Sequence, residues 1–104
     1  MKSGGYVYIL ANKPMGTLYI GSTSDLIGRI WQHKHKEIPG FTSKYSVDKL
    51  VYYEWHDSLC DMVIRERQLK KWERDWKFRL IIQKNPDWDD LYTELLINNG
   101  YSPE

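Results

Sequence analysis

The chain has 104 residues, of which 41% are hydrophobic and 28% are charged, and this composition fits one soluble domain and excludes a disordered chain. Its formal net charge of +1 conceals an uneven distribution. Residues 58–84 hold eight Lys or Arg against four Asp or Glu, whereas residues 85–104 hold five acids and no Lys or Arg. The basic segment suits either a nucleic-acid partner or a solvated helix surface.

The chain lacks the signals of an exported or membrane-spanning protein. Its apolar runs are far shorter than the roughly 20 residues needed to cross a bilayer, and the N-terminus has no signal-peptide core. Its single cysteine, Cys60, has no partner for an internal disulfide, which suits a reducing compartment. We therefore expect a cytoplasmic protein without membrane contact, with one domain over residues 1–97 and a flexible tail over residues 98–104.

The segment YVYILANKPMGTLYIG, residues 6–21, contains two β-rich runs around a turn and predicts a hairpin with a loop of more than two residues. Because strand side chains alternate, Tyr6, Tyr8 and Leu10 share one face of the first strand. On the second strand, Tyr19 points away from Leu18.

A helix is predicted from about residue 25 to residue 36, where STSD supplies capping side chains after Gly21 has ended the strand. Arg29 and His33 are four residues apart, so they lie together at the edge of its apolar stripe and can converge beside the sheet. The predicted core stripe consists of Leu26, Ile27, Ile30 and Trp31.

The segment IPGFTSKYSVDK, residues 38–49, has the composition of a loop, in which Lys44 and Tyr45 either contact a ligand or line the surface. Residues 50–55, LVYYEW, predict a third strand. Asp57 and Ser58 can cap the helix that follows.

That helix, residues 58–72, places Glu66 at the centre of an apolar stripe formed by Leu59, Met62, Val63 and Leu69. A buried carboxylate must be paired, neutralised or bound to a metal. The pattern leaves three interpretations open: a structural ion pair, a metal-binding or catalytic role, and a misplaced stripe.

Two further helices are predicted, divided at Asn85 because Pro86 disfavours helix in the preceding residue and suits a first helical turn. We expect the first to pack through Trp72, Trp76, Phe78, Ile81 and Ile82. In the second, the helical spacing favours a core role over base stacking for Trp88, Leu91, Tyr92 and Leu95.

The ordered set formed by YVY at 6–8, YIG at 19–21, Arg29, His33 and Glu66 resembles the GIY-YIG nucleases. The similarity extends from about Gly5 to Leu91. It is greatest to the small single-domain bacterial members, through LVYYE, RERQLKKW and NPDWDDL. One departure is that Tyr6 stands where the first motif has glycine.

The resemblance implies an α/β (α+β) fold in which a small three-stranded antiparallel sheet is flanked by helices, with further helices at the C-terminus. It also implies a site that uses one divalent cation, Mg²⁺ or Mn²⁺. By position, the catalytic residues are Tyr8, Tyr19, Arg29, His33 and Glu66, of which Glu66 is the metal ligand. Asn85 is the candidate for the late polar residue of the family.

The predicted function is therefore a metal-dependent DNA endonuclease or nickase, structure-selective and acting in DNA repair or recombination. The alternatives are a catalytically silent nucleic-acid-binding module and a protein-interaction domain. A domain this small is expected to recognise backbone shape, a nick, a branch or a single strand. RNA substrates, a protein partner and the oligomeric state are left open. The candidates for nucleic-acid contact are Lys34, Lys44, Tyr45, Lys70 and Asn85.

Overall fold

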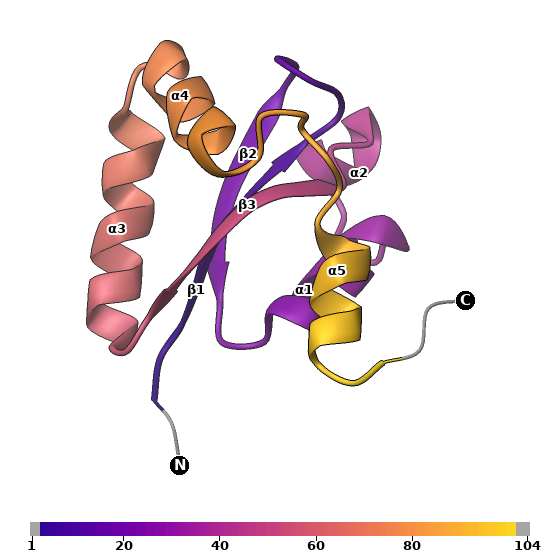
Figure 1. Ribbon diagram of the computed structural model, residues 1–104, viewed down its shortest axis with the longest axis vertical. Coiled ribbons are helices and arrows are strands. Elements are labelled where there is room, and N and C mark those ends of the chain that lie inside the picture. Colours follow the sequence, from indigo (N-terminus) through magenta and orange to yellow (C-terminus); the bar gives the residue numbers. More distant parts are fainter. Residues whose placement is uncertain (1–2, 102–104) are drawn as a thin grey trace.

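Three antiparallel strands form one sheet in the order β2-β1-β3 in the computed structural model, which describes residues 3–101 (Figure 1). The strands are β1 (Gly5–Ala11), β2 (Leu18–Thr23) and β3 (Lys49–His56). Within the described residues, five helices flank the sheet and complete the predicted α+β fold. They are α1 (Leu26–Lys34), α2 (Phe41–Tyr45), α3 (Leu59–Lys71), α4 (Arg74–Lys84) and α5 (Tyr92–Asn98).

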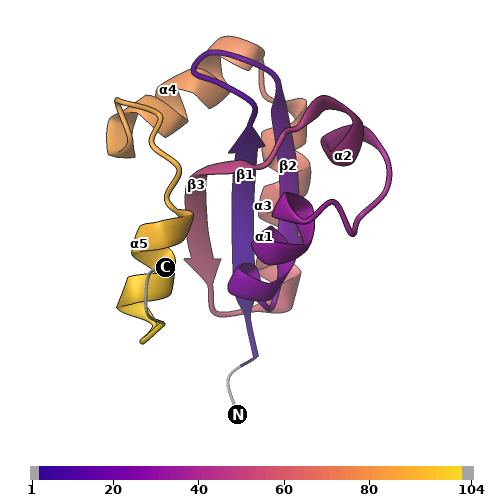
Figure 2. The same ribbon diagram turned by 90° about the vertical axis from the view of Figure 1, so that its right-hand side faces the viewer.

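The central strand β1 is buried on both faces, because helices cover each side of the sheet. Val7 and Ile9 are fully buried in a cluster with residues of α3 and α4. Tyr8 and Leu10 are equally buried in a second cluster with residues of α1 and α5. Figure 2 shows α1 in front of the sheet and α3 behind it. The predicted alternation along this strand is confirmed, and Tyr8 belongs to the α1 side.

The register between β1 and β2 brings both motif tyrosines to that side. Tyr8 pairs with Gly21, and Leu10 pairs with Tyr19. Directly opposed residues of an antiparallel pair project to the same face, so Tyr19 lies on the face of Tyr8. Ser22, the next residue after Gly21, projects to the α3 side.

The hairpin loop is held by side chains at both of its ends. The Asn12 Oδ1 atom accepts a hydrogen bond from the Thr17 amide at 3.0 Å. Arg74, the first residue of α4, donates from Nη2 to the Gly16 carbonyl at 2.6 Å. These contacts explain why a loop of more than two residues keeps a defined register.

The caps that the sequence predicts are present at two helices. Asp25 caps α1 by accepting from the Gly28 amide at 3.1 Å, and Ser58 caps α3 by accepting from the Asp61 amide at 3.3 Å. Helix α1 ends at Lys34, two residues earlier than predicted, and Lys36 has a φ of 55°, which a helix does not accommodate.

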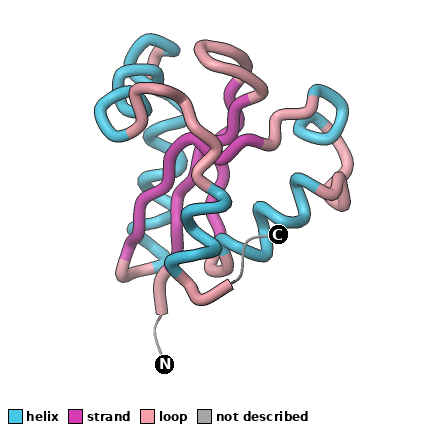
Figure 3. The backbone as a smooth tube through the Cα atoms, turned by 45° about the vertical axis from the view of Figure 1, so that its right-hand side comes forward, coloured by secondary structure: helices cyan, strands magenta, loops and turns pink. Residues whose placement is uncertain are grey.

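The segment predicted as a loop contains a short helix, α2, which Figure 3 shows between two loops. Gly40 precedes it with a φ of 115°, and Ser46 ends it in the left-handed conformation. Thr42 is its buried residue. Five residues provide too little helical periodicity to stand out among Pro, Gly and Ser, so the pattern did not reveal this helix.

The last predicted helix begins later than expected, because residues 85–91 form a turn instead of continuing from Pro86. Asn85 is buried and donates from Nδ2 to the Val51 carbonyl at 3.1 Å and to the Asp89 carbonyl at 2.9 Å. Its Oδ1 accepts from the Asp89 amide at 3.0 Å. Trp88 is buried against Phe78, as a core residue should be, but it lies in this turn with a φ of 57°.

On α1 and α4, three residues predicted for the core are exposed. Phe78 and Ile81 face the sheet from α4, whereas Trp76 and Ile82 are 51% and 39% exposed. On α1, Leu26 and Ile30 are buried, but Trp31 is 41% exposed. The apolar stripes on α1 and α4 are broader than the faces that these helices bury.

Over residues 3–101, the longest helix is too short and too polar to traverse a bilayer. Helix α5 ends at Asn98, and Tyr101 is exposed. The remainder of the predicted flexible tail, residues 102–104, lies outside the described residues.

Candidate active site

A buried row of polar side chains connects β1 to α1 and α2. The Tyr8 hydroxyl oxygen lies 3.1 Å from His33 Nε2, and His33 Nδ1 lies 3.1 Å from Thr42 Oγ1. His33 and Thr42 are 3% and 5% exposed. A buried hydroxyl must donate its proton to an acceptor, so this geometry favours donation from Tyr8 to Nε2 and from Nδ1–H to Thr42.

The absence of a side chain at Gly21 makes room for the Tyr8 hydroxyl. A Cβ atom at Gly21 would lie 2.5 Å from that oxygen and 3.1 Å from Cε2 of Tyr19. The Tyr19 ring is centred 6.4 Å from the Tyr8 ring and 5.6 Å from the His33 ring. The Tyr8 phenol thus reaches the edge strand β2, where the second tyrosine is within ring contact of the same histidine.

Burial sets the protonation of the Tyr8 and His33 pair. Desolvation, with a smaller contribution from Tyr19, raises the pKa of Tyr8 to about 12, although a hydrogen bond and the charge of Arg29 act in the opposite direction. Desolvation and the Arg29 charge lower the pKa of His33, against a weaker effect of Asp48. At neutral pH the phenol is protonated and the imidazole is neutral, so Nε2 can receive a proton.

Glu66 reaches the same edge strand from the other face of the sheet. Its Oε1 accepts a short hydrogen bond from Ser22 Oγ, and its Oε2 lies 2.6 Å from Lys70 Nζ. Burial raises the pKa of Glu66, but the hydrogen bonds from Lys70 and Ser22 and the charges of Lys70 and Arg67 outweigh that effect and lower it. Glu66 is also close enough to Tyr8 for its charge to raise the pKa of the phenol. Carboxylate and phenol therefore converge at Gly21 and Ser22.

The burial of α3 decides between the interpretations of Glu66. Met62 and Leu69 are buried, but Leu59 and Val63 are 48% and 36% exposed. The predicted stripe was too broad, and Glu66 lies at the margin of the buried face instead of at its centre. It is paired with Lys70 and remains partly accessible.

The donor set at Glu66 fits a magnesium-type cation. Such ions keep several waters and are bound through one or two carboxylates together with substrate phosphates. Glu66 is an ionised, partly accessible carboxylate of this kind. Within residues 3–101 no group of three or more His, Cys, Asp or Glu side chains forms a closed metal site. A single carboxylate ligand of this kind would leave the other coordination positions of such an ion to water and substrate.

Arg29 lies where β2 leads into α1. Its guanidinium acts to lower the pKa of the Tyr8 phenol, and it lines a cavity of about 450 Å³. The other lining residues include Thr23, Ser24, Trp31 and Gln32. A guanidinium that borders both the phenol and an open cavity is placed to bind a phosphate group.

Comparison with known proteins identifies the family of this chain. The family model of the GIY-YIG catalytic domain matches residues 4–79 of this chain. That range contains the five candidate site residues, Tyr8, Tyr19, Arg29, His33 and Glu66. The chain belongs to the GIY-YIG family. No solved structure gives a significant match.

Three relatives show how much of the chain the GIY-YIG similarity covers. A UPF0213 protein of Syntrophus aciditrophicus is 38% identical over 86 residues, covering 82% of this chain and 97% of that protein. A UPF0213 protein of Clostridium perfringens is 36% identical over 80 residues, covering 77% and 85%. One from Staphylococcus saprophyticus is 33% identical over 76 residues, covering 73% and 92%. GIY-YIG membership assigns a nuclease domain, whereas the names of these relatives state no activity.

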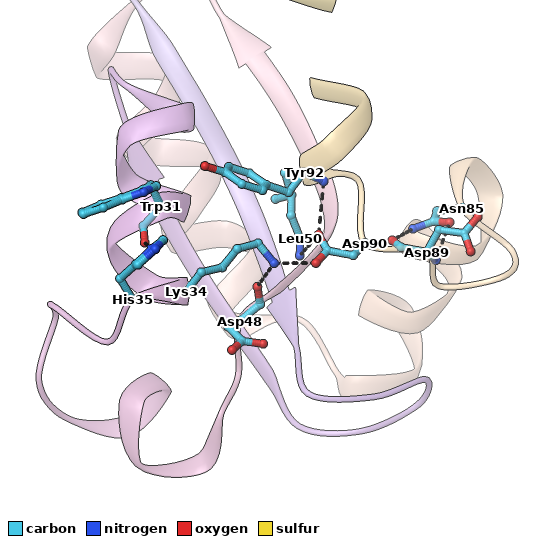
Figure 4. A network of polar contacts seen from close by, with 9 residues as sticks. All are labelled: Trp31, Lys34, His35, Asp48, Leu50, Asn85, Asp89, Asp90 and Tyr92. Atoms are coloured by element: carbon cyan, nitrogen blue, oxygen red, sulfur yellow. Dashed lines mark hydrogen bonds and ion pairs between the residues drawn. The ribbon is translucent and has the colours of Figure 1, made fainter. Parts of the chain in front are cut away.

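The predicted contact residues around the GIY-YIG site differ in how accessible they are. Lys34 lies 2.5 Å from Asp90 Oδ2 and donates to the Asp48 carbonyl at 3.0 Å, so it ties α1 to the turn before α5 (Figure 4). Lys44 and Tyr45 are exposed, with the ammonium 5.4 Å from the ring centre.

Asn85 does not match the role that the GIY-YIG resemblance suggested. It is 4% exposed, and both its amide nitrogen and its carbonyl oxygen bond to backbone groups of the chain. Figure 4 shows it in the turn with Asp89. Its side chain holds the α4–α5 connection, and its burial and its bonds to backbone groups do not favour contact with a nucleic acid.

The sequence analysis did not predict two residues that contact the candidate site, Thr42 and Ser22. Thr42 belongs to the short helix α2, and nothing in a Ser- and Gly-rich segment distinguishes one buried hydroxyl from its exposed neighbours. Ser22 follows the YIG motif directly, and strand alternation alone places it on the face opposite Tyr19. Strand alternation was therefore the signal that could have identified Ser22, because α3, the helix that contains Glu66, covers that face of the sheet.

Proposed function

We propose that this GIY-YIG protein is a metal-dependent endonuclease or nickase that hydrolyses phosphodiester bonds in DNA. The observation that carries the proposal is the convergence at β2. Tyr8, His33 and Arg29 approach this strand from the α1 side, and Glu66 approaches from the α3 side. Hydrolysis needs a base for water, a cation for the phosphate and an anionic ligand for a metal, and these side chains supply all three.

Tyr8 and His33 form the proton path. In the substrate complex the attacking water reaches the Tyr8 oxygen, which is buried in the free protein, and gives it a proton, while Tyr8 passes its own proton to His33 Nε2. The new P–O bond forms as the bond to the leaving sugar oxygen breaks. His33 Nδ1–H remains directed at Thr42, which stabilises the imidazolium. The negative charge of a bound phosphate favours the protonated imidazole, which offsets the lowered pKa of His33.

Arg29 and Tyr19 act on the phosphate side. The planar guanidinium of Arg29 matches two non-bridging phosphate oxygens, and its interaction strengthens as negative charge grows on them. Tyr19, half-buried beside Tyr8 and His33, positions the water or the phosphate through its hydroxyl. Both side chains come from segments next to Gly21, so substrate can approach along the edge strand.

Glu66 holds the cation, Mg²⁺ or Mn²⁺. When bound, that ion neutralises phosphate charge and stabilises the departing oxygen. Ser22 fixes the orientation of the Glu66 carboxylate through its hydrogen bond, and Lys70 compensates the charge that would otherwise hold a cation.

The small surface available for contact with DNA supports recognition of DNA structure instead of base sequence. A chain of 104 residues covers few base pairs, so we expect recognition of a nick, a branch or a single strand instead of a long sequence. Such selectivity suits an enzyme of DNA repair or recombination.

The proposal is tested by incubating the protein with labelled single-stranded, duplex, nicked and branched DNA in Mg²⁺, Mn²⁺ or EDTA. Glu66→Gln is assayed alongside Glu73→Gln, a matched change at an exposed glutamate that makes no side-chain cap at α4. We expect cation-dependent products that disappear in Glu66→Gln and persist in Glu73→Gln. Salt-sensitive binding with no products under any condition would instead support a silent binding module.

A further inference from the structure

Trp31 is an exposed tryptophan that is nevertheless held in one orientation. It is 41% exposed, and its ring stacks on the His35 imidazole with centroids 4.1 Å apart and planes inclined by 23°. His35 Nδ1 lies 2.9 Å from the Trp31 carbonyl oxygen, which fixes the imidazole beneath the indole. Figure 4 shows the pair on the side of α1 that points away from the Lys34 contacts. The indole is thus a preorganised platform.

The surroundings of Trp31 distinguish it from another exposed tryptophan, Trp76. Trp76 lies beside Trp72 on the α3–α4 side of the molecule. Trp31 instead lines the same cavity as Arg29, the side chain that borders the Tyr8 hydroxyl. The cavity measures about 450 Å³, within the ~300–1,000 Å³ typical of ligand pockets.

The polar lining of this cavity suits a nucleobase. Gln32 and Ser24 are exposed and line it, and an amide and a hydroxyl can each donate to or accept from the edge of a base. An aromatic face together with a few such groups is the usual way in which proteins bind a base that has left its stack.

We propose that the cavity between Trp31 and Arg29 binds an unpaired nucleobase adjacent to the scissile phosphate. This inference rests on the proposed function, because it takes Arg29 as the phosphate ligand. A base and its own phosphate are separated by one sugar, so a phosphate on Arg29 brings the neighbouring base to the cavity. The substrate class is a strand that is single-stranded or locally unpaired at the cut.

The energetics favour a base that is already unpaired. Stacking on an aromatic side chain contributes about 1–3 kcal/mol per base. Extracting a paired base from a duplex costs a few kcal/mol, which cancels that gain. The cavity therefore discriminates against intact duplex without reading its sequence.

Binding measurements in EDTA test this inference separately from cleavage. Fluorescence anisotropy compares a labelled oligothymidine, a strand of equal length with abasic positions, and a blunt duplex. The variants are Trp31→Ala, Trp31→Phe and, as the matched control, Trp76→Ala. We expect Trp31→Ala to weaken binding of the base-containing strand by about 5- to 160-fold, following the stacking energy above. Trp31→Phe should restore part of it, and Trp76→Ala should bind normally.

Binding of the abasic strand and of the duplex should be unchanged in Trp31→Ala. The inference is overturned if Trp31→Ala weakens all three ligands equally or weakens none of them. Thermal melting of each variant verifies that folding is retained, and Trp31→Phe provides the comparison if Trp31→Ala melts early. Cleavage with Mg²⁺ or Mn²⁺ is scored independently. A wild-type protein that cleaves DNA but binds the base-containing, abasic and duplex ligands equally well refutes the cavity alone, whereas base discrimination by the wild type without any cleavage refutes the nuclease proposal.

Discussion

The Tyr8 hydroxyl oxygen lies 3.1 Å from His33 Nε2, which connects the middle strand of the sheet to α1 through one hydrogen bond. The contact is buried, and its two groups have pKa values displaced in opposite directions, upward for the phenol and downward for the imidazole. A proton delivered to the phenol therefore has a neutral acceptor next to it.

Tyr8→Phe removes this hydroxyl and keeps the ring that packs in the core. We expect the cleavage rate to fall by about 10²-fold or more, because general-base assistance contributes 10²–10⁴-fold. The lost hydrogen bond should reduce the free energy of unfolding by only about 1–3 kcal/mol. Single-turnover cleavage and urea unfolding measure the two effects. Wild-type cleavage by the variant would remove Tyr8 from the proton path.

Arg29→Ala should impair cleavage more than binding. An arginine whose contact strengthens as charge develops on phosphate contributes about 10²–10³-fold to the rate, and much less to ground-state affinity. Arg29→Lys should recover only part of the rate, because an ammonium lacks the planar pair of donors. DNA affinity by anisotropy is compared with single-turnover rates. A parallel loss of affinity and rate would make Arg29 a binding contact.

Thr42 acts through His33 as a positioning residue. Thr42→Val keeps the shape but removes the acceptor for Nδ1–H, 3.1 Å away. Losing that acceptor disfavours the imidazolium, so we expect about 10-fold slower cleavage and an acid limb of the pH–rate profile that moves to lower pH. Thr42→Ser should restore both. A slower rate with an unmoved pH profile would indicate a purely structural role.

His33 should make the stability of the protein depend on pH. Its pKa is lowered in the folded state by burial and by Arg29, with Asp48 opposing. Below about pH 6.5 the unfolded chain binds the proton more readily, so stability declines as pH falls toward the folded pKa. The slope from this one group is at most about 1.4 kcal/mol per pH unit.

Urea unfolding at several pH values measures that slope. His33→Gln cannot titrate at this position, so its slope between about pH 7 and pH 5 should be smaller than that of the wild type. His35→Gln is the control for removing an exposed imidazole. Identical slopes for wild type and His33→Gln would show that other groups account for the acid sensitivity.

Lys70 would compete with a cation for Glu66, since its Nζ lies 2.6 Å from Oε2. Lys70→Met keeps the apolar stem and removes the charge. We expect Mn²⁺ to bind about 30-fold more tightly, because a divalent cation and an ammonium about 4 Å apart repel by about 2 kcal/mol in water. Calorimetric Mn²⁺ titration without DNA measures this, with exposed Lys71→Met as the control. An equal change in both variants would reflect net charge alone.

Local patterns predicted much of this fold. The alternation in YVYIL identified both faces of β1, and the four-residue spacing of Arg29 and His33 placed both beside Tyr8. Hydroxyl and carboxylate caps marked the starts of α1 and α3. These features depend on neighbouring residues, so the sequence contains them directly.

Features that depend on distant partners were beyond such patterns. Trp88 adopts a positive φ because the Asn85 turn is anchored to Val51 in another element. Thr42 is buried because α2 closes over His33, a contact between helices that no periodicity encodes. The exposure of Trp31 similarly depends on how α1 rolls against the sheet.

The pairing of β2 with β1 couples the two halves of the site to the hairpin loop. Side chains alternate along a strand, so a slip of one residue would turn Tyr19 toward α3 and Ser22 toward α1. Tyr19 would then leave the side of Tyr8 and His33, and Ser22 would lose its hydrogen bond to Glu66. Asn12 and Arg74, which fix the loop, prevent that slip although neither belongs to the proposed chemistry. A register error at this turn would leave a folded sheet in which the residues of the proposed catalytic site no longer lie together.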